Sequence, residues 1–315
     1  MSFKLMSVFT DISSTDCRTL LRNYEIGEYR HHQGLPGGVE NSNFALATTQ
    51  GHFIITLFER QPEYGARYTL AFMQRCRARG IPAPTVITTT NKTILSQLRE
   101  KPVAICTHLE GAHVTTPKKY HCYEVGRTLA LVHRVGSGKL GERPNPFDVD
   151  WRNRMVTQVN KYLDEYQLGI LQEALQVIGP STKSELLSGT IHADAFRDNI
   201  LFTGKKLTGV VDFYYACHER FMLDLAVAIN DWCSTDTGRL REKMQAAMLE
   251  GYASVRKPAE GESNAIPILL VESALRFWLS RLYDQHFTRT GTDIEVKPPE
   301  EFERCLRHRL KTLAK

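Results

Sequence analysis

Short apolar runs separated by tight polar links dominate the first third of the chain. Runs of alternating or β-branched residues with Gly- or Asn-rich links between them are typical of antiparallel strands. The strands are expected at residues 28–35, 43–49, 52–58, 84–89 and 103–109. Apolar residues recur at helical spacing over residues 62–79 and stop before Gly80 and the prolines that follow it. This part of the chain therefore predicts a sheet with one helix against it.

Beyond residue 111 the apolar residues follow the spacing of long amphipathic helices. Helices are expected at residues 120–135, 151–166, 169–178, 223–232, 239–254 and 266–287. One compact segment, residues 191–214, interrupts them. The expected fold class is therefore α+β, with a β-rich lobe over residues 1–107 and a mainly helical lobe over residues 108–315.

Composition narrows the classes of protein without naming one. The 315 residues are 24% charged and 42% hydrophobic, which is typical of a globular protein, and no apolar run approaches the ~18 residues that span a bilayer. The net charge of +5 comes from basic residues interleaved with acidic ones, so we expect neither a nucleic-acid partner nor a membrane partner. Seven scattered cysteines without a CxxC pair suggest reduced thiols and a cytoplasmic location. The oligomeric state is left open.

The segment IHADAFRDNILF, followed by TGKK and LTGVVDF, concentrates the polar chemistry. If the chain turns at Lys205 and Lys206, Asn199 lies opposite Asp212, with Cβ atoms ~4.5–5.5 Å apart. An amide oxygen and a carboxylate at one point suit Mg²⁺, and Asp194 on the preceding loop can face the same point. A register shift of one residue would instead send the two side chains to opposite faces.

Asp194, Asn199 and Asp212-Phe213 also reproduce the order and spacing of kinase active sites. Together with GVENSNF, VDFYYAC, DLAVAINDWC and RFWLSRL, they give the chain a resemblance to the protein-kinase-like small-molecule kinases. This is the aminoglycoside phosphotransferase and choline kinase group, and the resemblance is strongest to its homoserine kinases. It implies a bilobal protein-kinase-like fold whose first lobe binds the nucleotide and whose second lobe carries catalysis and the acceptor.

The activity implied is ATP-dependent phosphorylation of the hydroxyl of L-homoserine, in threonine biosynthesis, with ATP and Mg²⁺ as cofactors. Asp194 would be the catalytic base and Asn199 and Asp212 the metal ligands, while His192 and Asp224 would support the loop. Two alternatives stay open. One is a kinase of another small alcohol, such as choline, an aminoglycoside or methylthioribose; the other is a nucleotide-binding module without catalysis.

The nucleotide would lie against the first lobe. Adjacent glycines expose backbone N–H groups to phosphates, and the neighbouring polar side chains add donors. The candidates are Gly37, Gly38, Asn41, Ser42 and Asn43, together with Thr107 and Leu109 for the adenine edge. Thr56 stands where kinases carry a lysine for the phosphates, and the resembling homoserine kinases have Thr there too. The group that replaces the lysine is left open.

The acceptor would need a cationic partner for its carboxylate. Arg276 and Arg281 are candidates because a guanidinium binds a carboxylate through two hydrogen bonds. The alternative is that they form ordinary helix-surface pairs, Arg276 with Glu272 and Arg281 with Asp284. Tyr215 and Asp231 are candidates for the chain and the amine of the acceptor.

Overall fold

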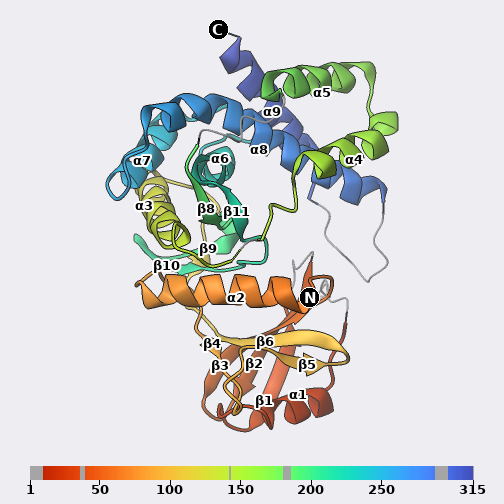
Figure 1. The fold of residues 1–315 in the computed structure, drawn as a ribbon, viewed down its shortest axis with the longest axis vertical. Helices are drawn as coiled ribbons and strands as arrows, with labels where there is room; N and C mark the ends of the chain where they lie inside the picture. Colours follow the sequence, from red (N-terminus) through yellow and green to blue (C-terminus); the bar gives the residue numbers. More distant parts are fainter. Residues whose placement is uncertain (1–9, 36–39, 142, 180–185, 288–296, 315) are drawn as a thin grey trace. The chain divides into compact units, whose positions relative to one another are not determined.

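The computed structural model describes residues 10–35, 40–141, 143–179, 186–287 and 297–314. It divides into two compact units, and the chain passes from the first to the second between Glu110 and Gly111 (Figure 1). That the first unit binds the nucleotide and the second carries the catalytic and acceptor sites stays a prediction. None of the helices in the described part of the chain is long and apolar enough to cross a membrane.

The first unit is built on an antiparallel sheet, as predicted from the alternating pattern. Its strand order is β1-β2-β3-β6-β4, and β5 also pairs with β6. The strands are β1 Tyr29–Gly34, β2 Asn41–Thr48, β3 Gly51–Phe58, β4 Val86–Ile87, β5 Ser96–Leu98 and β6 Lys101–Thr107. The predicted helix is α2, Glu63–Ala78. Two short elements were not predicted, α1 Ser14–Leu21 and β5, because neither is long enough to show a clear apolar period.

Alternation along β2 and β3 decides which side chains of the first unit are buried. Phe44, Leu46, Ile55 and Leu57 lie on one face and pack with the apolar side of α1. Side chains of opposite parity lie on the other face. Asn43 and Thr56 belong to that second set and are cross-strand partners.

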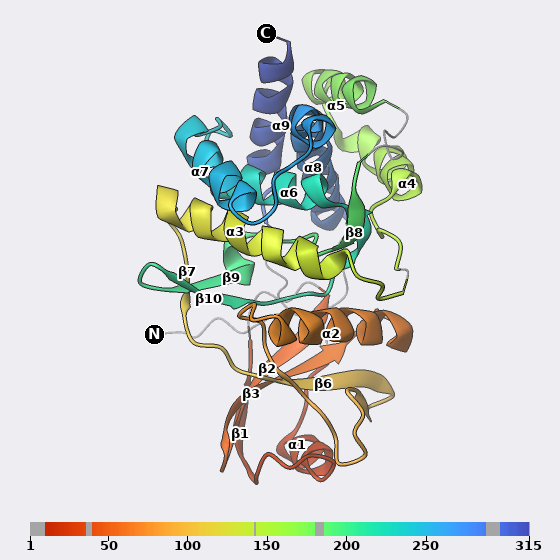
Figure 2. The same cartoon turned by 60° about the vertical axis from the view of Figure 1, so that its left-hand side comes forward.

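The second unit is mainly helical, as predicted. Its helices are α3 Lys119–Gly136, α4 Val149–Val159, α5 Glu165–Ile178, α6 Phe221–Trp232, α7 Glu242–Ala253, α8 Glu260–His286 and α9 Glu300–Leu313. Its strands are β7 Ala112–His113, β8 Ser188–Ile191, β9 Ile200–Thr203, β10 Lys206–Val210 and β11 Cys217–Arg220. Apolar residues of α4, α5, α6, α8 and α9 form one core around Trp278. Figure 2 shows α8 among the other helices of this unit.

Two helix boundaries differ clearly from the sequence-based expectation, and one helix is additional. The break after α4 falls at Leu163 and Asp164 rather than before Gly169, because the Asp164 carboxylate caps α5 by accepting from the Gln167 N–H (2.7 Å). Helix α8 begins at Glu260, six residues earlier than expected, and contains Pro267. Helix α9 was not predicted.

Helices α3 and α7 touch at their backbones. A Cβ atom on Gly126 would lie 2.0 Å from the Met248 carbonyl oxygen, and one on Gly251 would lie 2.0 Å from the Tyr123 carbonyl oxygen. These separations are well inside van der Waals contact. The two glycines therefore allow an approach that any larger residue would prevent.

We predict that Gly126→Ala lowers the free energy of unfolding by about 1–3 kcal/mol, because α7 must move away to admit the methyl group. Gly169→Ala is the matched control, since this glycine is also helical and a Cβ there meets no atom within 4 Å. It should stabilise the protein by up to about 1 kcal/mol through helix propensity. Urea unfolding of both variants measures the difference, and equal effects would contradict the packing argument.

Candidate active site

The loop between β8 and β9 carries two of the three predicted catalytic groups and holds them together. The Asn199 side-chain N–H₂ donates to the Asp194 backbone carbonyl (2.8 Å) and to the Asp194 carboxylate (3.0 Å). Both protons of the amide are used on one side. The Asn199 Oδ1 atom therefore faces away from Asp194 and can accept a hydrogen bond or bind a cation.

The predicted hairpin exists, but its predicted register is wrong. The two-residue turn is Gly204-Lys205 rather than Lys205-Lys206, so Thr203 pairs with Lys206, and this turn alone would place Asn199 opposite Val210. A bulge between Leu207 and Gly209 moves the ladder back by one residue toward the predicted register. Asn199 consequently faces Val211, whose N–H donates to the Asn199 carbonyl (2.9 Å). The error lies in the turn, which the sequence pattern placed one residue too late along the chain, and the unpredicted bulge removes part of that error.

Asp212 lies in the same region as Asp194 and Asn199, but not through the predicted strand pairing. It lies one residue beyond the ladder and has φ of +56°, a conformation that few non-glycine residues adopt. The charge of Asp194 raises the pKa of Asp212, so the two carboxylates lie within electrostatic range of each other. All three predicted groups, Asp194, Asn199 and Asp212, are thus brought together, although the ladder contact expected between two of them is absent.

The two carboxylates destabilise each other in their ionised forms. Burial raises the pKa of Asp194 to about 6, and the charge of Asp198 adds to this, while Arg276, Lys297 and the Asn199 hydrogen bond act in the opposite direction. The pKa of Asp212 is raised by desolvation of its carboxylate and by the charge of Asp194. More than a third of Asp212 is exposed, so water moderates this repulsion. A divalent cation would relieve it further.

These groups fit the site of a hard cation. Among the described residues there is no cluster of three or more His, Cys, Asp or Glu side chains that could hold a metal. Mg²⁺ does not need one, because it takes one or two protein oxygens and keeps its other positions for water and phosphate. The Asn199 Oδ1 and the Asp212 carboxylate supply such a pair.

A buried carboxylate holds the loop in place from behind. Asp224 of α6 is fully buried and accepts hydrogen bonds from the backbone N–H groups of His192 (3.0 Å) and Ala193 (2.8 Å). The His192 ring bonds the Val211 carbonyl (2.9 Å), which ties the loop to the strand that leads to Asp212. These are the contacts that the predicted supporting roles of His192 and Asp224 require.

A chain of buried polar side chains continues from Asp224 into the helices. The His133 ring of α3 bonds Asp224 (3.0 Å) on one side and the Tyr252 hydroxyl of α7 (2.8 Å) on the other. Burial raises the pKa of Asp224, but the hydrogen bond and charge of His133 outweigh it and leave the pKa below its ordinary value. No sequence pattern singled out His133 as a partner of Asp224, since the two residues lie far apart along the chain.

The predicted acceptor residues separate into two pairs. Arg276 and Tyr215 lie together near the loop: the Arg276 guanidinium donates to the Ala193 carbonyl (2.7 Å) and lies 5.5 Å from the centre of the Tyr215 ring. Asp231 and Arg281 are engaged elsewhere. Asp231 accepts from the Arg197 backbone N–H (2.7 Å) and pairs with its guanidinium (3.1 Å), and Arg281 is bound to Glu301 (2.6 Å).

Asp231 fixes the loop through Arg197 and Arg281 joins α8 to α9, so both side chains already have charged partners. The alternative helix-surface pairs are wrong. Glu272 pairs with Arg220 (2.6 Å) rather than with Arg276, and Arg281 pairs with Glu301 rather than with Asp284.

The nucleotide candidates of the first unit are also divided. Thr56 donates to the Asn43 side-chain oxygen (2.8 Å), so these two lie together on the sheet face opposite the apolar core. Ser42 lies on the core face, fully buried and bonded to Glu59, which makes it a poor nucleotide contact. The side-chain oxygen of Asn41 is buried with no hydrogen-bond partner among the described residues. Gly37 and Gly38 lie outside the described residues.

The two adenine-edge candidates differ as well. The backbone N–H of Thr107 donates to the Thr85 carbonyl (2.9 Å), and the Thr107 hydroxyl oxygen accepts from the Thr85 N–H (2.9 Å). The backbone donor of Thr107 is therefore already used. Leu109 lies just beyond β6 and is partly exposed. Of the two, Leu109 remains the better candidate.

Comparison with known proteins agrees with this arrangement. Residues 31–257 match the phosphotransferase enzyme family. The chain belongs to that family. Homoserine kinase of Agrobacterium fabrum is 37% identical over 306 residues, which cover 96% of this chain and 95% of that protein. Homoserine kinase of Polaromonas naphthalenivorans is 36% identical over 310 residues, covering 97% and 98%.

Solved structures show the same fold at much lower identity. An amicoumacin kinase in complex with AMP-PNP, Ca²⁺ and Ami has a TM-score of 0.72 and 13% identity, covering 95% of this chain and 92% of that one. A spectinomycin phosphotransferase in complex with ADP has a TM-score of 0.67 and 12% identity, covering 96% and 100%. The protein-kinase-like α+β fold predicted from the sequence is therefore confirmed, and so is the family.

The charges around Asp194 predict opposite shifts in the pH dependence of turnover. A reaction that uses Asp194 as its base needs the ionised form, so kcat/KM falls about tenfold per pH unit below its pKa of about 6. Lys297 lowers this pKa, so Lys297→Gln should move the acid limb to higher pH. Asp198 raises it, so Asp198→Asn should move the limb to lower pH.

The two residues pair with each other and are about half exposed, so each shift should be only about 0.2–0.5 pH units. The kcat/KM profile from pH 5 to 8 measures both. The ionisation of ATP itself is common to all variants and cancels in the comparison. Shifts in the same direction would show that Asp194 does not govern the acid limb.

Proposed function

We propose that this protein transfers the γ-phosphoryl group of ATP to the hydroxyl of L-homoserine, giving O-phospho-L-homoserine for threonine biosynthesis. The observation that carries the proposal is the similarity of nearly the whole chain to curated homoserine kinases. The convergence of Asp194, Asn199 and Asp212 supports it, because these are the groups that phosphoryl transfer requires.

Asp194 is the base in this proposal. Its carboxylate is held by Asn199 on a loop that Asp224 fixes from below, so it is positioned before the acceptor arrives. It accepts the proton of the acceptor hydroxyl as the oxygen attacks the γ-phosphorus, and the bond from that phosphorus to the β–γ bridging oxygen breaks to release ADP. Its raised pKa of about 6 suits this role, since a base is most effective when its pKa is close to the working pH.

Asn199 and Asp212 hold the divalent cation, which we propose is Mg²⁺. When bound, the ion neutralises charge on the β- and γ-phosphate oxygens. Asn43, Thr56 and Leu109 are the contacts of the first unit that we retain for ATP. The presence of an ATP analogue and Ca²⁺ in the amicoumacin kinase structure supports a nucleotide and a divalent cation as cofactors.

The expected partners are therefore small molecules only, homoserine and ATP. Basic residues are interleaved with acidic ones along the chain, so we expect no nucleic-acid partner. We propose a cytoplasmic location, in line with seven cysteines that are all buried and unpaired by disulfides.

The acceptor can be identified by ADP release from ATP with L-homoserine, choline, methylthioribose and an aminoglycoside in parallel. We expect kcat/KM for homoserine to exceed that for the other alcohols by at least about 100-fold, because a site built for charged groups rejects molecules that leave those groups unpaired. Turnover with another alcohol and none with homoserine would refute the acceptor but keep the kinase. No turnover with any acceptor would favour the nucleotide-binding module.

We predict that Asp194→Asn lowers kcat by about 10²–10⁴-fold while the Kd for ATP changes less than about threefold, because the amide keeps the shape but cannot accept the proton. Asp198→Asn is the control within the same loop, and its kcat at pH 8 should stay within about threefold of the wild type. Single-turnover kinetics and nucleotide titration measure the two constants. Near-normal turnover in Asp194→Asn would show that Asp194 is not the base.

A further inference from the structure

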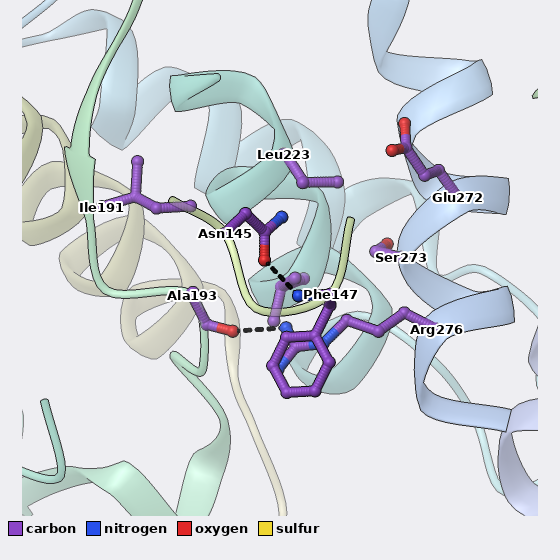
Figure 3. A pocket seen from close by; sticks show the side chains of 9 residues that line it. Asn145, Phe147, Ile191, Ala193, Leu223, Glu272, Ser273 and Arg276 are labelled. Carbon is purple, nitrogen blue, oxygen red and sulfur yellow. Dashed lines mark hydrogen bonds between the residues drawn. The ribbon is translucent and has the colours of Figure 1, made fainter. Parts of the chain in front are cut away.

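A small cavity in the second unit lies beside the loop that carries Asp194, and Ala193, the residue before Asp194, is part of its lining. Ala193 of the loop lines one side, and Glu272, Ser273 and Arg276 of α8 line the other (Figure 3). Leu223 and Val227 of α6 contribute apolar walls. The cavity therefore offers apolar surface with a cation and an anion one helical turn apart.

The cation is Arg276, and the described residues do not neutralise it directly. Its guanidinium donates to the Ala193 carbonyl (2.7 Å) and lies over the Phe147 ring, 3.7 Å from the ring centre. No carboxylate of the described chain lies within ion-pair distance of it, and its Nε–H has no hydrogen-bond partner there. Figure 3 shows the side chain reaching from α8 to Ala193 beside Phe147. A carboxylate is the group that would complete its contacts.

The anion is Glu272, and it belongs to a group with excess negative charge. Arg220 binds both Glu219 (2.9 Å) and Glu272 (2.6 Å), so one guanidinium serves two carboxylates. Glu219 is also satisfied by the Asn145 amide (3.0 Å). The second oxygen of Glu272 accepts no hydrogen bond from the described residues. One negative charge at this end of the cavity is therefore left to be balanced.

Glu272 and Arg276 could pair with each other, and the structure shows that they do not. Glu272 and Arg276 are four residues apart on one helix, which is the spacing at which opposite charges usually pair. Here each is held by a different partner, Arg220 and Ala193, and they do not pair with each other. The cavity thus presents one unbalanced positive charge and one unbalanced negative charge at separate places. A zwitterionic ligand, which carries one charge of each sign, would balance both.

We infer that this cavity binds the amino-acid end of the acceptor, Arg276 taking the α-carboxylate and Glu272 the α-ammonium group. The inference rests on the proposed function and specifies how the acceptor is recognised. Ala193 is adjacent to Asp194, so an acceptor held there by its charged end can extend its hydroxyl toward the base. Leu223 and Val227 would contact its methylene groups.

A purely structural role for Arg276 makes a different prediction. If Arg276 only braces the loop through the Ala193 carbonyl, its loss should lower kcat for every acceptor by the same factor. If it binds the carboxylate, its loss should change the preference between acceptors with and without that group. The relative kcat/KM for two acceptors therefore separates the roles, because a general loss of loop order cancels in the ratio.

The experiment compares three acceptors in four variants. The acceptors are L-homoserine, 4-hydroxybutyrate, which lacks the ammonium group, and 3-amino-1-propanol, which lacks the carboxylate. The variants are Glu272→Gln and Arg276→Gln, with Glu260→Gln and Arg281→Gln as controls that remove the same charges elsewhere on α8. Glu260 is exposed, and Arg281 is bound to Glu301.

We expect Glu272→Gln to lower kcat/KM for homoserine by at least tenfold. The kcat/KM for 4-hydroxybutyrate should stay within about threefold of the wild-type value, since that acceptor has no ammonium group to lose its partner. Arg276→Gln should lower kcat/KM for homoserine, relative to kcat/KM for 3-amino-1-propanol, by at least tenfold. Both controls should keep the wild-type preferences. If neither analogue is a substrate or inhibitor of the wild type, the KM for homoserine decides, and it should rise tenfold in both variants and in neither control.

Uniform losses across acceptors, or unchanged preferences, would overturn the inference while homoserine turnover by the wild type keeps the proposed function. A wild type that does not use homoserine would instead refute the proposed function. The two failures are therefore distinguishable in one set of assays.

Discussion

The catalytic loop depends on one buried carboxylate. Asp224 accepts hydrogen bonds from two successive backbone N–H groups, of His192 and Ala193, and so fixes the direction in which the loop leaves β8. Ala193 has φ of +67°, a conformation that costs a non-glycine residue about 1–3 kcal/mol. Two contacts offset this cost, from Asp224 to its N–H and from Arg276 to its carbonyl. Asp194 follows directly, so its position is set before any ligand binds.

Keeping Asp224 ionised in the core requires the helices around it. A fully buried carboxylate is costly unless its oxygens are bonded. His133 supplies the third hydrogen bond, Tyr252 fixes the His133 ring, and Arg256 donates to the Tyr252 hydroxyl (3.0 Å). The backbone contact of α3 with α7, made possible by Gly126 and Gly251, brings His133 and Tyr252 together. Packing far from the reaction centre is thereby linked to the geometry of the loop.

The same segment of structure also connects the base with the proposed acceptor cavity. Ala193 is contacted by Asp224 on one side and by Arg276 on the other, and Asp194 is the next residue. In the proposed mechanism, recognition of the acceptor and placement of the base therefore depend on the same stretch of backbone. Such sharing suits a reaction whose acceleration comes mainly from positioning and electrostatics.

The sequence by itself determined the antiparallel sheet and most of the helices, and it singled out Asp194, Asn199 and Asp212 as a group. These follow from local periodicity and from the fixed order of Asp194, Asn199 and Asp212, which does not depend on how distant segments meet. Only the tertiary structure decided the hairpin register, because the pattern of apolar residues fixes neither which two residues form the turn nor where a bulge occurs. It alone showed that Arg281 and Asp231 are bound elsewhere and that Glu272 and Arg276 stay apart. The partner of a charged side chain is set by residues far away in sequence, and spacing along one helix cannot reveal them.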